Sequence, residues 1–382
     1  MGILLAAIGS LLVVGAILDA ANTLVSTRLQ VGRFWPTEIF YRRIWPVWRT
    51  LGRIKDDRRR EIVLSGFAPA SLIGLLLLWV ITEIFGWSLV WWALRETFAV
   101  PLPSFGDALY FSGVVFFTIG FGDIVPAGGA VRALTLVEAF GGLGTLALVI
   151  GYLPALYSSY SARETQLLML DDLTGDRIMP VSLIESRCPD GELDRLYAFF
   201  HEWERWTAQV LETHTSYPML TLFRSQHLGQ SWITAIGVVL DAAAMAAASI
   251  PGADEREPMF LYRRGNRMLH HFADRLGIRR VEPEPLNKSF FRMAYGRMAA
   301  KGIVLRDLDD AFDRLVRLRG TYVVELESLI DEMLAPRGFW SHTIQGPGHQ
   351  RHAGQSEQQR QERVLPGVEA GADEEAEDLG PI

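Results

Sequence analysis

The sequence predicts an all-α membrane protein with a second helical part outside the membrane, and three observations indicate this fold class. The first 160 residues of the 382-residue chain hold most of its long apolar runs. Farther along, apolar residues recur at steps of three and four, which is the period of amphipathic helices. Convincing strand patterns, in which apolar and polar residues alternate, are lacking. We therefore expect helices in a bilayer followed by helices in water.

Composition narrows the classes of function. The formal net charge of −7 argues against general nucleic-acid binding, because nucleic acids bind basic surfaces. Cys188 is the single cysteine, which excludes intrachain disulfides and a cysteine-based metal cluster within one chain. A buried, unreactive thiol is the expected state of this side chain.

Residues 1–27 are predicted to form an N-terminal transmembrane helix. Gly2–Val25 is nearly continuous apolar sequence, and crossing a bilayer takes about 20 residues. A signal peptide fits less well, because no basic residue precedes the run and the run exceeds a usual apolar region of about 7–15 residues. Asp19 and Asn22, near its far end, either face a neighbouring helix or reach the membrane interface.

Residues 28–62 are predicted to form a basic, aromatic linker that lies on the membrane surface. Its aromatic and basic residues are interleaved: Trp35, Tyr41, Trp45 and Trp48 with Arg33, Arg42, Arg43 and Arg49. Such mixtures suit the headgroup layer. Pro36 and Pro46 are expected to break the linker into short helices. Nucleic-acid binding is the alternative, and it is disfavoured because spanning segments bracket the linker.

Two further spans, Gly66–Leu94 and Val131–Tyr157, enclose a loop. The basic linker joins the first two spans, so the positive-inside bias places it in the cytoplasm. The N-terminus and the enclosed loop are then outside, and everything after Tyr157 is cytoplasmic. The composition favours a bacterial plasma membrane. No span carries arginine at every third position, so a voltage-sensing helix is not expected.

The enclosed loop contains TIGFGD, residues 118–123, in which glycines alternate with bulkier residues. Successive carbonyl oxygens point the same way only if alternate residues take positive φ, which glycine adopts without steric cost. The face formed by these oxygens would be extended by the Thr118 hydroxyl. Ile119 and Phe121 are expected to point away and to wedge the loop against its support. Copies arranged about an axis would stack rings of oxygens, which can replace the hydration shell of a potassium ion.

DALYFSGVVFFTIGFGDIVP, residues 107–126, resembles the pore helix and selectivity filter of potassium channels, closest to the bacterial type with one pore loop between two pore-forming helices. The resemblance covers about residues 66–158, and its core signature is specific because it lies between two spans. It implies a pore domain over residues 63–162. Since one chain supplies a single loop, the family's fourfold closure of the filter implies a homotetramer.

The resemblance also assigns residues. Potassium ions would be coordinated by the filter, Thr118, Ile119, Gly120, Phe121 and Gly122, and no organic cofactor is expected. Asp107–Phe117 would be the pore helix, Asp123 would stand at the outer mouth, and Gly142 would be the flexible glycine of the inner helix. The family usually has threonine where this chain has Phe117, and many members have tyrosine in place of Phe121. These departures leave selectivity for potassium over sodium open.

The inner helix offers a candidate gate. Leu146, Ile150, Pro154 and Ser158 follow Gly142 at four-residue steps and share one face. If that face lines the pore, Ile150 and Pro154 form an apolar constriction, and Pro154 bends the helix. The alternative is that the face packs against neighbouring helices.

Two glutamates, Glu83 and Glu138, fall inside spans, where carboxyl groups usually have partners or a function. We expect Glu138 to brace the pore helix through a hydrogen bond, with Ser112 as the candidate partner. A proton sensor is the alternative.

Residues 163–342 are predicted to form an all-helical cytoplasmic domain, and residues 343–382 a disordered tail. Helices are expected at Gly191–His214, Ser231–Gly252, Asn287–Lys301 and Asp307–Leu334. The alanine-rich second of these, with Asp241 at its centre, is predicted to be a core helix rather than a fourth span. The domain's histidines match no familiar metal-ligand spacing: His201, His214, His227, His270 and His271. Glycine-rich nucleotide-binding motifs are also lacking.

Two hypotheses from different classes follow. The first is a homotetrameric potassium channel in a bilayer, or within the same class a weakly selective cation channel, whose cytoplasmic domain assembles or gates the pore. An unknown regulatory ligand or protein would then act on this domain. The second is a membrane-anchored signalling or interaction protein with a vestigial pore. Nothing in the sequence indicates an enzyme.

Overall fold

The computed structural model describes residues 1–24, 36–54, 56–174, 179–225, 231–283 and 285–336. Over these residues the chain is helical and forms no strand, apart from an isolated antiparallel bridge between Phe98 and Pro126. The all-α prediction is thereby confirmed. The predicted disordered tail, the linker residues Arg33 and Trp35, and His227 lie outside the described residues.

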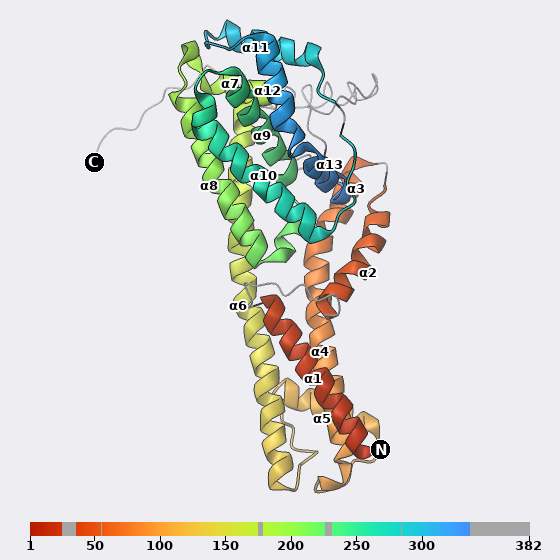
Figure 1. The fold of residues 1–382 in the computed structure, drawn as a ribbon. Helices are drawn as coiled ribbons and strands as arrows, with labels where there is room; N and C mark the ends of the chain where they lie inside the picture. Colours follow the sequence, from red (N-terminus) through yellow and green to blue (C-terminus); the bar gives the residue numbers. More distant parts are fainter. Residues whose placement is uncertain (25–35, 55, 175–178, 226–230, 284, 337–382) are drawn as a thin grey trace, which may run out of the picture. The chain divides into compact units, whose positions relative to one another are not determined.

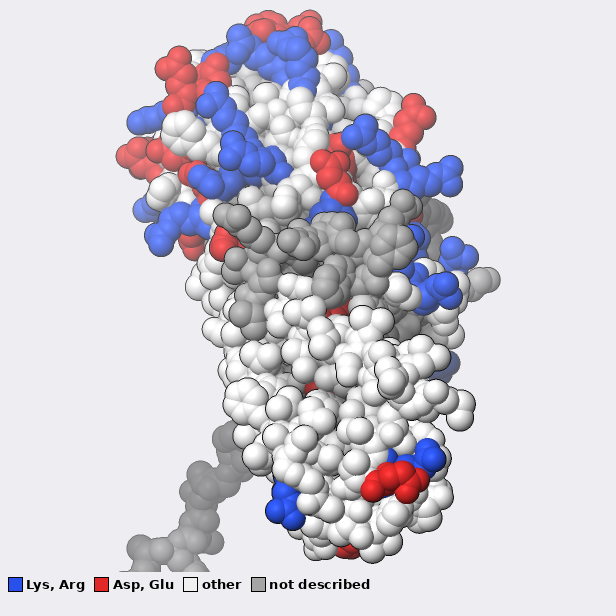
Figure 2. Space-filling model, turned by 60° about the horizontal axis from the view of Figure 1, so that its bottom comes forward, with Lys and Arg blue, Asp and Glu red and all other residues white. Residues whose placement is uncertain are grey.

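The apolar helices of the first half are α1 (Gly2–Leu24), α4 (Phe67–Ala93) and α6 (Gly129–Thr174), with the shorter α5 (Phe105–Phe116) between α4 and α6 (Figure 1). Helices α1, α4 and α6 have the length and the apolar composition needed to cross a membrane. On the face shown in Figure 2, Lys, Arg, Asp and Glu are sparse over this part of the surface and dense over the rest of the protein. That distribution suits helices in contact with lipid.

Helix α1 packs along α4 at a crossing that only glycine permits. A Cβ atom built on Gly9 would lie 2.3 Å from the carbonyl oxygen of Gly86, so the two backbones touch. Near the end of α1, Asp19 is buried and accepts hydrogen bonds from Trp79 Nε1 at 2.7 Å and from the backbone N–H of Thr37 at 3.1 Å. Of the two expectations for Asp19, the contact with a neighbouring helix is therefore correct.

The linker forms α2 (Pro36–Leu51) and α3 (Asp57–Ser65). The predicted break at Pro46 is wrong, because α2 continues through it. Trp45 and Trp48 on either side of the proline both pack on Phe67, with ring centroids 4.9 and 5.5 Å from it. This shared packing surface holds the two turns in one helix although Pro46 lacks an amide hydrogen.

Helix α6 is much longer than the predicted third span. It runs through Pro154 and Tyr157 without interruption, and the expected boundary between residues 162 and 163 falls inside it. Beyond Tyr157 the side chains of Arg163, Leu167 and Leu170 are buried, the two leucines in the core of the C-terminal bundle. Burial of this face accounts for the extension of the helix past the apolar run.

The C-terminal bundle surrounds one central helix, α9 (Trp232–Ser249), which contacts α7, α10, α12 and α13. Although α9 is apolar enough to span a membrane, 94% of its apolar window is buried inside the protein, as expected for a core helix. The other helices of the bundle are α7 (Pro180–Arg187), α8 (Asp194–Ser216), α10 (Glu257–Leu276), α11 (Lys288–Ala300), α12 (Leu308–Gly320) and α13 (Val323–Glu332). Single 3₁₀ turns occupy Arg95–Thr97, Pro189–Gly191, Pro218–Leu222 and Ala253–Glu255.

Two details of the bundle bear on the sequence predictions. The helix expected over Asp307–Leu334 is two helices, α12 and α13, because the chain turns at Thr321 and Tyr322. The turn buries Tyr322, whose hydroxyl donates a hydrogen bond to Asp241 of α9. Cys188 is buried, as predicted.

Candidate functional site

The site begins with α5, a short helix whose start is fixed by a capping box. The Ser104 side chain accepts a hydrogen bond from the backbone N–H of Asp107, and the Asp107 carboxylate accepts one from the backbone N–H of Ser104 at 3.0 Å. One face of α5 is buried, including Ala108, Phe111 and Ser112. The helix ends at Phe116, so its negative dipole end points toward the loop that follows.

The TIGFGD loop leaves this helix end with an alternating backbone. Thr118, Gly120 and Gly122 have φ values of 55°, 63° and 79°. The residues between them are not in the left-handed region. The glycine alternation in the sequence predicts this pattern, and Thr118 joins it despite its Cβ. Alternation of this kind turns successive carbonyl oxygens toward one side, which is the geometry that replaces water around a cation.

Hydrogen bonds tie the two ends of the loop to the rest of the pore region. The backbone N–H of Thr118 donates to Val115 O and that of Ile119 to Val114 O, both at 2.9 Å, so the loop starts from the last turn of α5. Beyond the loop, Ala99 N–H donates to Val125 O at 2.9 Å, and the Arg132 side chain donates to Pro126 O at 3.0 Å. The loop is thus anchored at both ends by hydrogen bonds to its neighbouring segments.

The loop itself is uncovered. All residues from Thr118 to Asp123 are exposed, and Ile119 and Phe121 are 51% and 68% exposed. These two side chains were expected to wedge the loop against a support, but no such support covers them among the described residues of one chain. At the end of the loop, Asp123 interacts with the hydroxyl group of Tyr110 in α5.

The predicted hinge and gate residues lie apart from the loop on α6. Gly142 packs on the end of α5: a Cβ atom there would lie 2.6 Å from the carbonyl oxygen of Phe116. Ile150 is 72% exposed, and Pro154 and Ser158 are exposed as well. The structure therefore gives Gly142 a close-packing role, while its hinge role and the gate at Ile150 and Pro154 stay predictions.

The two intramembrane glutamates are fully buried and partnered. Glu138 accepts hydrogen bonds from the Ser112 hydroxyl and from Trp91 Nε1, the latter at 2.7 Å. The predicted bond between Glu138 and the pore helix is confirmed, and Trp91 is an additional partner. Glu83 accepts a hydrogen bond from the Thr145 hydroxyl at 2.8 Å. Because unpartnered carboxyl groups are costly in a bilayer, these bonds indicate a built feature of the pore region.

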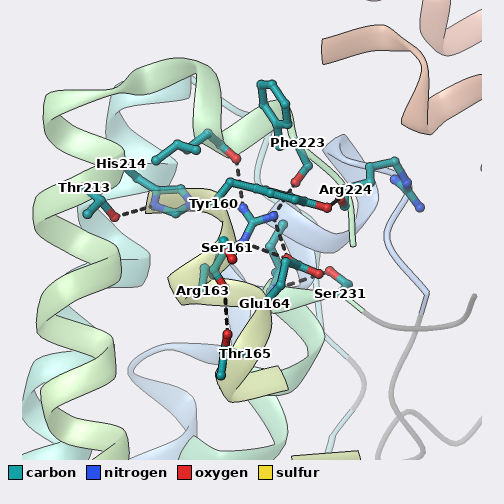
Figure 3. Close-up of polar contacts among 12 residues, drawn as sticks. Tyr160, Ser161, Arg163, Glu164, Thr165, Thr213, His214, Phe223, Arg224 and Ser231 are labelled. Atoms are coloured by element: carbon teal, nitrogen blue, oxygen red, sulfur yellow. Dashed lines mark hydrogen bonds and ion pairs between the residues drawn. The ribbon is translucent and has the colours of Figure 1, made fainter. Parts of the chain in front are cut away.

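A second polar cluster, around Arg163, joins α6 to the bundle (Figure 3). The buried guanidinium donates to Glu164, to the carbonyl oxygens of Leu220 and Phe223 at 2.9 and 2.8 Å, and to His214 Nε2 at 3.1 Å. Since arginine only donates, Nε2 of His214 accepts and its Nδ1 carries the proton. Burial, together with the Arg163 charge, holds the pKa of His214 well below its usual value, so the ring is neutral.

Sequence reasoning missed the Arg163 cluster. One signal was present, because Arg163 follows Leu156 and Tyr160 by seven and three residues and therefore lies on the same face of the helix. Its partners are backbone carbonyls and a histidine some fifty residues away, and these contacts leave no pattern in the sequence. Among the described residues, no three His, Cys, Asp or Glu side chains gather in a way that could hold a metal ion.

Comparison with known proteins supports the interpretation of the pore region as part of an ion channel. Residues 74–158 match the model of a family described as "Ion channel". The uncharacterized membrane protein YdjJ of Bacillus subtilis (strain 168) is 28% identical over 210 residues, which cover 54% of this chain and 60% of that protein. The chain thus spans less than two thirds of this relative. No solved structure matches the chain.

The family match covers the part of α4 from Gly74 onward, α5, the TIGFGD loop and α6 as far as Ser158. The resemblance to an ion channel pore domain is thereby confirmed for this region of a membrane protein, and it points to a channel rather than an enzyme. The match does not extend to α1 or to the bundle.

Proposed function

We propose that the protein is a homotetrameric, potassium-selective channel in which residues 74–158 form the pore of each chain. Backbone oxygens of Thr118, Ile119, Gly120 and Phe121, together with Gly122, would coordinate the potassium ions passing through. Asp123 would draw cations to the outer mouth. One observation carries the proposal: positive φ alternates at Thr118, Gly120 and Gly122 in a loop that leaves the end of a buried pore helix.

The exposure of the loop supports the tetramer. Apolar side chains as large as Ile119 and Phe121 are costly to leave uncovered, and no described part of the same chain covers them. Additional copies about an axis would supply that cover and would bring the carbonyl oxygens of four loops together. On α6, the exposed face with Ile150 and Pro154 would then line the inner pore as a gate, and Gly142 would be its hinge.

The C-terminal bundle is proposed to gate or assemble this pore from the cytoplasmic side of a bacterial cell membrane, with the N-terminus outside. Support comes from the Arg163 cluster, because it fastens the helix proposed to line the pore to α8 and to the segment Pro218–Phe223. A regulatory ligand or protein that moves the bundle would therefore pull on α6.

Ion flux from liposomes containing the purified full-length protein tests the proposal. We expect potassium flux that barium blocks, and a reversal potential that follows the potassium gradient when sodium is present on the other side. Equal permeability to the two ions would replace the proposal by a weakly selective cation channel, the alternative that Phe117 and Phe121 leave open. Silence in both gradients, with empty liposomes as the baseline, would favour a vestigial pore in a signalling protein.

A further inference from the structure

The carboxyl group of Glu138 occupies the point where three helices of the pore region meet. It accepts from Ser112 of α5 and from Trp91 of α4, and it belongs to α6 itself. All three side chains are completely buried. The Ser112 hydroxyl also lies 3.0 Å from the carbonyl oxygen of Ile84 in α4. One carboxyl group thus ties the pore helix to both long helices at once.

This cluster lies close in the chain to the oxygens proposed to bind the ion. Ser112 is one helical turn before Phe116, the last residue of α5. The loop is attached to this last turn by the backbone hydrogen bonds that Thr118 and Ile119 donate to α5. A shift or rotation of α5 therefore moves the first oxygens of the filter. Because discrimination between cations depends on how closely oxygens surround the ion, a small displacement changes selectivity.

One turn farther along α6, Gly142 presses on the carbonyl oxygen of Phe116. Helix α6 thus contacts α5 at two consecutive turns, through the hydrogen bond of Glu138 and through the close approach of the backbone at Gly142. The second contact limits how closely the helices approach, whereas the first has direction, because hydrogen bonds require alignment. Glu138 is therefore the contact that sets the rotation of α5.

We infer that Glu138 is a positioning residue for ion selectivity: through Ser112 and Trp91 it fixes the pore helix, and with it the filter oxygens, against the two long helices. The inference rests on the proposed channel function and deepens it. Glu83 provides a matched comparison. It is also a fully buried glutamate, but it accepts its hydrogen bond from Thr145, so it joins α4 to α6 and makes no hydrogen bond to α5 among the described residues.

The permeability ratio of potassium to sodium, from reversal potentials of the full-length protein in liposomes, tests this role. Glu138→Ala is expected to lower the ratio at least about tenfold, the change that roughly 1.4 kcal/mol produces. Ser112→Ala should lower it in the same direction by less. Glu138→Gln, which keeps one accepting oxygen, should fall between the wild type and Glu138→Ala. Glu83→Gln should leave the ratio within about twofold of the wild type.

Several outcomes would overturn the inference. Unchanged ratios in Glu138→Ala and Ser112→Ala would do so, as would an equal drop in Glu83→Gln, which would indicate a general packing effect. If Glu138→Ala does not fold, as judged by its elution in detergent, Ser112→Ala and Glu138→Gln decide the matter. A silent wild-type protein would refute the proposed function itself and this inference with it. A conducting wild type with unaltered variants would refute the inference alone.

Discussion

Helices α6 and α9 are both apolar enough to span a membrane, yet they have opposite surroundings. In α9, 94% of the apolar window is buried by the protein's own bundle, whereas in α6 the share is 17%. The bundle therefore completes its core within one chain. The pore region leaves its core to be completed by lipid and, as proposed, by further copies. Apolar composition alone does not reveal what covers a helix.

Gly120→Ala has the largest expected effect and separates the two regions, because it should abolish conduction through the pore and leave the bundle folded. Gly120 has a φ of 63°, and an L-residue there costs roughly 1–2 kcal/mol per chain, multiplied by the proposed four copies. We expect potassium flux from liposomes to fall at least about a hundredfold.

The matched control is Gly128→Ala. Gly128 also has no neighbour within 4 Å of a built Cβ, and its φ is not in the left-handed region. This variant should conduct like the wild type. Normal flux through Gly120→Ala would contradict the assignment of the filter.

Arg163→Ala should have the reverse effect and weaken the bundle. It leaves the buried Glu164 carboxylate and the carbonyl oxygens of Leu220 and Phe223 without their donor. Breaking a buried charged pair costs about 3–5 kcal/mol of unfolding free energy. Denaturant unfolding in detergent, followed by tryptophan fluorescence, measures the loss. Arg267→Ala, at an exposed arginine of α10, should change little, and an equally small effect of Arg163→Ala would show that the cluster is dispensable.

The pH dependence of the same cluster is a smaller effect. His214 has a lowered pKa in the folded protein, so below about pH 6.5 the unfolded chain binds a proton that the folded one does not. Its contribution to stability is therefore complete above that pH and declines as the pH falls, by up to about 1.4 kcal/mol per unit.

Comparison of unfolding free energies at pH 7 and pH 5 for the wild type and His214→Gln isolates this term. His271, whose pKa is also lowered by partial burial, contributes equally to both proteins. The wild type should lose more stability on acidification than the variant does. Parallel losses would mean that His214 is not held neutral by Arg163 and burial.

The sequence predicted the pore region more fully than the bundle, and the reason is physical. The alternating glycines act on their own backbone, so positive φ at Gly120 and Gly122 was predictable from TIGFGD. The bond between Glu138 and Ser112 was predictable because a carboxyl group inside a span usually has a partner. The Arg163 cluster depends on contacts between distant segments. Pro46 misled because packing on Phe67, a tertiary contact, outweighs the local preference.

Helix α6 is one unbroken helix of 46 residues, about 69 Å at 1.5 Å per residue, which is more than twice the thickness of a bilayer core. Such a rod acts as a lever between the TIGFGD loop and the bundle. A tilt of about 5° around its start would carry its far end through roughly 6 Å. A displacement of a few ångströms among the bundle helices thus corresponds to a tilt of α6 by only a few degrees where it packs on α5. A force applied at one end of α6 is transmitted to the other.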